Sequence, residues 1–82
     1  MADRAEIAKK VIEIIAKKMD KSPDEITEQM TFINDLGADS LDTVEIMMDI
    51  EDEFGLSIPE EEAQKIETIA LAIDYVASHS EQ

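Results

Sequence analysis

One serine in this chain is better placed for chemistry than any other side chain. Ser40 follows the small residues Gly37 and Ala38 and stands at the start of a helical, acidic segment. A serine hydroxyl needs a neighbouring base to act as a nucleophile, and the one histidine, His79, lies near the C-terminus. We therefore expect another enzyme to modify Ser40. A helix N-terminus favours a phosphodiester at that position through its dipole and its free N–H groups.

Ser40 also has a purely structural interpretation. Serine and aspartate are both common N-cap residues, so either Ser40 or Asp39 is expected to accept a backbone N–H bond at the start of the helix. Capping and modification are compatible, and both roles can hold at once.

The helix that begins near Ser40 is predicted to end at Phe54, because Gly55 supplies a left-handed C-terminal cap. At about 100° per residue it has two apolar faces. The face expected to join the core contains Ile46, Met47, Ile50 and Phe54. The second face contains Leu41, Val44 and Met48, and it is flanked by Asp42, Glu45, Asp49 and Asp52.

A small bundle buries only one of these faces well. We therefore expect the second face to stay exposed, at a cost of up to about 1.5 to 3 kcal/mol for each large apolar side chain. Such a cost indicates a binding surface. The alternative is that the helix lies deeper in the bundle and buries both faces.

Helical spacing of apolar residues continues through the rest of the chain, and no alternating stretch indicates a sheet. We predict an all-α fold, a small four-helix bundle in one domain over residues 1–82, with three longer helices and one short third helix. A long loop joins helices one and two. The helices are expected over about Asp3–Lys18, Ser40–Phe54, Pro59–Ile66 and, after a Thr68 cap, as far as about Ala77.

The long loop, which runs to Ala38, contains two signals of order. Ser22-Pro23-Asp24-Glu25 is a helix-start signature that predicts one short turn. Phe32 and Leu36 are expected to anchor the loop on the core.

Charge and composition exclude several functions. The 82 residues carry 7 Lys and Arg against 21 Asp and Glu, a formal net charge of -14, and neither Lys nor Arg occurs from Ser22 to Gln64. Such a surface repels nucleic acid and anionic membranes and attracts basic proteins.

The absence of cysteine excludes a disulfide framework, a thiolate nucleophile and a zinc-thiolate site. With no apolar run near the length of a membrane span and no signal-peptide pattern, we expect a soluble, cytoplasmic monomer.

A calcium site is not expected. Asp35, Gly37 and Asp39 alternate as in a calcium loop, but an EF-hand needs an oxygen ligand at its third position and glutamate at its twelfth. Counted from Asp35, these positions hold Gly37 and Ile46. No metal site is predicted.

Several motifs in the same order resemble an acyl carrier protein of type II fatty acid synthesis. They are Asp35-Leu36-Gly37-Ala38-Asp39-Ser40-Leu41-Asp42, Glu51-Asp52-Glu53-Phe54, Ile58-Pro59 and Ala72-Ile73-Asp74-Tyr75. The resemblance covers nearly the whole chain. It departs at Asn34, where relatives often carry an acid.

The resemblance implies a non-catalytic carrier. A phosphopantetheinyl transferase would attach 4'-phosphopantetheine from coenzyme A to Ser40. Fatty acyl chains would then be carried as thioesters on the terminal thiol of the phosphopantetheine. The partners would be that transferase, fatty acid synthase enzymes and acyltransferases. Their basic surfaces would recognise Asp39, Leu41, Asp42, Val44, Glu45, Met48, Glu51 and Asp52. An acyl chain would be sheltered by Phe32, Ile46, Ile50, Ile58, Ala63 and Ile66, for each of which plain core packing is the alternative.

Two other functions remain open from the sequence. A stand-alone carrier of aminoacyl or polyketide groups would use the same arm. An unmodified acidic adaptor would use the Leu41, Val44 and Met48 face and would need no cofactor.

Overall fold

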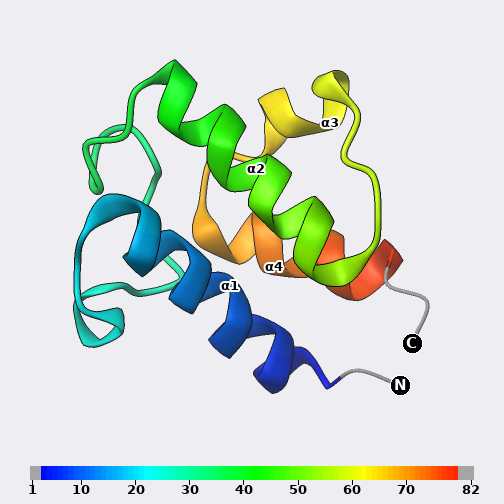
Figure 1. The fold of residues 1–82 in the computed structure, drawn as a ribbon, viewed down its shortest axis with the longest axis horizontal. Helices are drawn as coiled ribbons and strands as arrows, with labels where there is room; N and C mark the ends of the chain where they lie inside the picture. The colour runs from blue at the N-terminus through cyan, green and yellow to red at the C-terminus, as the bar shows by residue number, and fades with distance from the viewer. Residues whose placement is uncertain (1–2, 80–82) are drawn as a thin grey trace.

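The computed structural model describes residues 3–79 and has four α-helices and one short 3-10 helix. They are α1 (Arg4–Met19), η1 (Pro23–Glu25), α2 (Ser40–Phe54), α3 (Glu60–Lys65) and α4 (Ile69–His79). Figure 1 shows α2 lying across the bundle, with α1 and α4 on one side of it and the short α3 near the other. The predicted all-α bundle with a short third helix is confirmed, and each boundary differs from the prediction by no more than two residues.

α1 packs against both α2 and α4 through one apolar face. Ile7, Val11 and Ile15 are buried on that face, whereas Ile14 and Met19 are partly buried. The helix ends one residue later than predicted, because Asp20 adopts a left-handed conformation with φ 58° and its N–H reaches the Ala16 and Lys17 carbonyls. A non-glycine residue in that role has no strong sequence signal.

α2 has the two faces expected from its sequence. Ile46, Met47 and Ile50 are buried, and Gly55 caps the C-terminus with φ 65°. Leu41, Val44 and Met48 are 64%, 54% and 55% exposed. The alternative in which both faces are buried is therefore excluded.

The long α1–α2 loop is ordered by local and distant contacts. Ser22 and Glu25 form a reciprocal capping box at η1, as the helix-start signature predicts. Phe32 and Leu36 are buried, so their predicted role as anchors is confirmed. Backbone bonds then join the loop to the residues before and within α4: Phe32 N–H to Glu67 O at 3.2 Å, Ile69 N–H to Met30 O at 3.1 Å and Ala70 N–H to Glu28 O at 2.8 Å.

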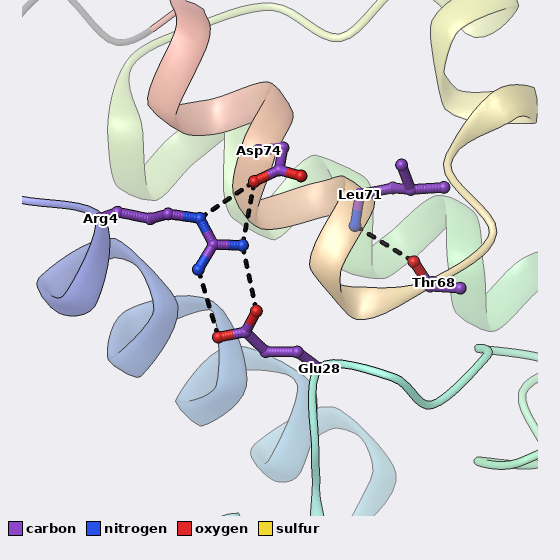
Figure 2. Close-up of polar contacts among 5 residues, drawn as sticks. All are labelled: Arg4, Glu28, Thr68, Leu71 and Asp74. Carbon is purple, nitrogen blue, oxygen red and sulfur yellow. Dashed lines mark hydrogen bonds and ion pairs between the residues drawn. The ribbon is translucent and has the colours of Figure 1, made fainter.

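α3 begins at Glu60 rather than at Pro59, which stands one residue before it. α4 begins after Thr68, whose hydroxyl accepts the Leu71 N–H at 3.2 Å (Figure 2). It extends to His79, two residues past the predicted end. Its buried residues are Ile69, Ala72, Ile73 and Val76.

One arginine links three segments that are distant in sequence. Figure 2 shows the Arg4 guanidinium between the Glu28 carboxylate of the long loop and the Asp74 carboxylate of α4. The shortest contacts are 3.0 Å to Glu28 and 2.9 Å to Asp74. These hydrogen bonds, the one to Glu28 first, raise the pKa of Arg4 above its ordinary value.

Candidate functional site

Ser40 is the first residue of α2 and is exposed. Asp39, not Ser40, is the N-cap: its Oδ1 accepts the Asp42 N–H at 2.9 Å, and Asp42 Oδ2 accepts the Asp39 N–H at 3.2 Å. This reciprocal capping box settles which of the two candidates caps the helix. Because Asp39 performs the capping, the Ser40 hydroxyl is not needed for it.

No histidine of the described chain lines the groove beside Ser40. His79 stacks on Tyr75 at the far end of α4, with ring centroids 4.0 Å apart and Nδ1 2.9 Å from the Tyr75 carbonyl oxygen. Of the described residues around Ser40 in the adjoining groove, none is His, Lys or Arg. The arrangement therefore offers an accessible hydroxyl to an external enzyme, and within residues 3–79 the groove beside it supplies no histidine or lysine as a general base.

A groove of about 870 Å³ opens beside Ser40. It lies between the 31–34 stretch of the long loop, one side of α2, and the segment from Ile58 to Glu67 that contains α3. Phe32, Met47, Ile58, Ala63 and Ile66 supply apolar walls, so the groove is suited to an apolar ligand.

Four of the six residues predicted to shelter an acyl chain line this groove: Phe32, Ile58, Ala63 and Ile66. Ile46 and Ile50 do not line it. Both are 0% exposed and lie on the core face of α2, which packs toward α1. They were included because of the family resemblance, and whether an acyl chain reaches them stays a prediction.

The residues predicted to form the recognition surface fall into two groups. Asp39, Leu41, Val44, Met48 and Asp52 are exposed. Asp42, Glu45 and Glu51 are half-buried, and each carboxylate has a partner within the chain: Asp39 N–H, Lys18 and Ile58 N–H, respectively. The second group therefore has structural roles that the sequence argument did not anticipate.

Lys18 of α1 reaches the acidic side of α2. Its Nζ lies 3.3 Å from Glu45 Oε1 and 3.5 Å from Asp49 Oδ2. The hydrogen bond to Glu45, more than any other contact, raises the pKa of Lys18 above its ordinary value. Lys18 lies outside residues 22–64, the segment without Lys or Arg, so the sequence alone does not reveal this contact.

Ile33 is a further exposed residue that the sequence argument missed. It is 57% exposed and lines the groove together with Val44 and Met48. The exposed apolar surface of α2 therefore continues onto the loop. Since Ile33 belongs to no helix, helical periodicity carried no signal for it.

Two general findings apply to the described part of the chain. No helix within residues 3–79 has both the length and the apolar character needed to cross a bilayer. Over the same residues, no cluster of three or more His, Cys, Asp or Glu side chains is arranged to hold a metal ion.

Comparison with known proteins agrees with this geometry. A protein-family model described as "Phosphopantetheine attachment site" matches residues 9–76. The acyl carrier proteins of two strains of Porphyromonas gingivalis are each 51% identical over 72 residues, which cover 88% of this chain and 92% of theirs. A solved structure of the acyl carrier protein from Enterococcus faecalis is 42% identical, with a TM-score of 0.80 over 96% of this chain and 100% of that one.

The fold, the exposed serine at the start of an acidic helix and these similarities lead to one family. The family match covers most of the chain, and the curated relatives are far above the identity at which a shared fold alone would be inferred. The chain belongs to the acyl carrier proteins, the phosphopantetheine-bearing carriers of acyl groups in fatty acid synthesis.

Proposed function

We propose that the Ser40 hydroxyl carries the 4'-phosphopantetheine arm of this carrier and that the groove beside it receives the acyl chain. The observation that supports this most directly is the position of Ser40, exposed at the first turn of α2 and at the edge of an apolar groove. The chain contains no cysteine, so the thiol that forms the thioester comes from the arm.

Attachment of the arm transfers a phosphopantetheinyl group from the pyrophosphate of coenzyme A to the serine hydroxyl, which becomes a phosphodiester. The Ser40 oxygen forms a bond to the phosphorus that bears the pantetheine group of coenzyme A. The pyrophosphate bond breaks, and adenosine 3',5'-bisphosphate leaves. The transferase removes the hydroxyl proton, because the groove around Ser40 supplies no histidine or lysine to do so.

The phosphodiester is favoured by the start of α2. Backbone N–H groups in the first turn carry the positive end of the helix dipole, which stabilises a nearby negative charge by about 0.3 to 1 kcal/mol at a surface. The Asp39 and Asp42 carboxylates each accept a hydrogen bond from the other residue's N–H. These bonds do not involve the Ser40 hydroxyl.

Acyl carriage then uses the walls of the groove. An arm that begins at Ser40 delivers an acyl chain to the side of α2 where Phe32, Ala63 and Ile66 are found. Burial of each methylene in such a site contributes about 0.8 kcal/mol, which favours sheltering the chain over leaving it in water.

Recognition by partners is proposed for the exposed face of α2 and its acidic flank. The apolar part is Leu41, Val44 and Met48, and Ile33 extends it. The acids are Asp39, Asp42, Glu45, Glu51 and Asp52. Fitting partners have basic surfaces around an apolar contact: a phosphopantetheinyl transferase, the enzymes of fatty acid synthase, and acyltransferases.

Three broader features are part of the same proposal. Residues 1–82 form one acyl carrier domain, and the protein acts as a monomer in the cytoplasm. The high negative charge supports this, because it opposes self-association and binding to anionic membranes.

The test is enzymatic modification followed by intact-mass measurement. The purified apo chain is incubated with coenzyme A and a broad-specificity phosphopantetheinyl transferase, beside a Ser40→Ala variant. We expect one added phosphopantetheinyl group in the natural chain and none in the variant. A folded chain that gains no mass, with a transferase active on another carrier, would favour the unmodified-adaptor function instead.

A further inference from the structure

The α3 segment is held to the bundle at few points. α3 itself has no buried residue and no side-chain N-cap, and it is only six residues long. Ala63 of α3 is only partly buried against the core, and the buried apolar anchors lie outside the helix, at Ile58 before it and Ile66 after it, both 8% exposed. Because this segment forms one wall of the groove, the contacts that hold Ile58 in place also hold that wall in place.

Two side-chain hydrogen bonds hold the stretch just before α3. Glu51 Oε2 of α2 accepts the Ile58 N–H at 2.6 Å, and the Tyr75 hydroxyl of α4 donates to the Ser57 carbonyl at 3.3 Å. The Glu51 bond is partly buried and short, as charge-assisted bonds are. It is therefore the stronger of the two.

Glu51 is also exposed enough to meet a partner. Its side chain lines the groove, it is only half-buried, and no Lys or Arg of the described chain forms an ion pair with it. Its hydrogen-bond donor is a neutral amide. A cation brought by a partner would therefore compete well with Ile58 for the carboxylate.

We propose that the Glu51–Ile58 hydrogen bond holds the α3 segment against α2 in the free protein and that a basic side chain of the docked partner breaks it. The partner's cation draws the Glu51 carboxylate away from the Ile58 N–H. The α3 segment, from Ile58 to Glu67, is then released from α2, the groove widens, and the acyl chain can leave toward the partner. Glu51 is thus a positioning residue that couples docking to cargo release, an inference that rests on the proposed function.

The first measurement is amide hydrogen exchange at Ile58 in the unmodified protein, with no partner. Glu51→Ala removes the acceptor, Glu51→Gln keeps an acceptor without the charge, and Asp52→Asn removes the neighbouring charge but leaves the bond. We expect Ile58 exchange to be about ten- to a hundredfold faster in Glu51→Ala, intermediate in Glu51→Gln and unchanged in Asp52→Asn. Equal exchange at Ile58 in the natural chain and in Glu51→Ala would overturn the proposal.

The second measurement adds the partner. With a phosphopantetheinyl transferase bound and coenzyme A omitted, we expect Ile58 exchange to accelerate in the natural chain. It should change much less in Glu51→Gln, whose neutral amide does not attract the cation. Slower Ile58 exchange in the natural chain on binding would contradict release by docking.

These outcomes are separable from failure of the proposed function. Exchange at Ile58 in the unmodified chain does not depend on any arm, whereas the mass gain at Ser40 does not depend on the Glu51–Ile58 bond. Exchange of the buried Ile46 and Ile50 amides serves as the folding control: if Glu51→Ala also accelerates these, Glu51→Gln alone decides, and its Ile58 exchange must still exceed that of Asp52→Asn.

Discussion

At the start of α2, two adjacent residues have different tasks. Asp39 caps the helix, and Ser40 presents its hydroxyl. The two are separable by mutation because the cap needs a hydrogen-bond acceptor, while recognition by a basic partner needs a negative charge.

Substitution of Asp39 should therefore affect stability and recognition differently. Asp39→Ala removes the acceptor of the Asp42 N–H and should lower the free energy of unfolding by about 0.5 to 2 kcal/mol. Asp39→Asn keeps an acceptor and should be close to the natural chain. Urea unfolding measures the free energies of unfolding of the two variants. Both variants should also bind the transferase more slowly, since both lose the negative charge of Asp39. If Asn destabilises as much as Ala, the charge rather than the acceptor stabilises this helix start.

Lys18 gives a prediction about pH. Its pKa is raised in the folded protein, chiefly by the hydrogen bond to Glu45, so the folded state holds the proton more tightly than the unfolded state. That contribution to stability is fully present below pH 10.5, the ordinary pKa of the group, and is lost as the pH rises through the higher folded value.

The natural chain should therefore be more stable than Lys18→Gln at neutral pH, and the difference should shrink at strongly alkaline pH. Urea unfolding of both proteins across this range measures it. Lys17→Gln is the matched control, because it removes the same charge one position away. A difference that stays constant through the alkaline range would show that the Lys18 ammonium does not stabilise the fold.

At the scale of the element, α2 has one face for the core and one for partners. Ile50 is 0% exposed and Met48 is 55% exposed, although they are two residues apart. Ile50→Ala should lower the free energy of unfolding by about 2 to 5 kcal/mol. Met48→Ala should change it by less than about 0.5 kcal/mol, yet should slow modification by the transferase. The prediction is checked by measuring the free energy of unfolding and the rate of modification for both variants. A destabilised Met48→Ala would mean that the exposed face of α2 also packs against the protein in solution.

Elements with local signals were predictable from sequence. The periodicity of α2, its terminal Gly55 and the Ser22 capping box each depend on residues within a few positions of one another. Positions that depend on distant parts of the chain were not. The Arg4 contacts to Glu28 and Asp74 and the Lys18 contacts to α2 require the folded arrangement.

The candidate site also combines features that local sequence predicts with features that depend on distant parts of the chain. Ser40 and the exposed face of α2 follow from residue type and helical geometry. The groove does not, because its walls come from a loop, α2 and the α3 segment. That is why Ile46 and Ile50, predicted to shelter the acyl chain, do not line the groove, and why Ile33 was missed.

At the scale of the whole molecule, charge is distributed unequally. All positive charges of the sequence lie outside residues 22–64, which contain α2 and most of α3. Basic partners should therefore be attracted toward the face that carries Ser40.

Association with a basic partner should consequently depend strongly on salt. The Debye length falls from about 30 Å at 0.01 M to about 3 Å at 1 M, so the association rate should fall by at least about tenfold over that range. Stopped-flow measurement with the transferase tests this, and the dissociation rate should change less. An association rate that is flat across added salt would show that the acidic surface does not guide the encounter.

The most direct test of carriage is to locate the cargo on the protein. The arm is attached enzymatically, loaded with a medium-length acyl chain, and examined by isotope-filtered NMR in which only the protein carries 13C. We expect contacts from the arm to the residues around Ser40, and contacts from the acyl methyl group to Phe32, Ala63 and Ile66. An arm on another residue, or an acyl chain in contact only with the α1–α4 core at Ile15 and Val76, would contradict the assignment of Ser40 and its groove.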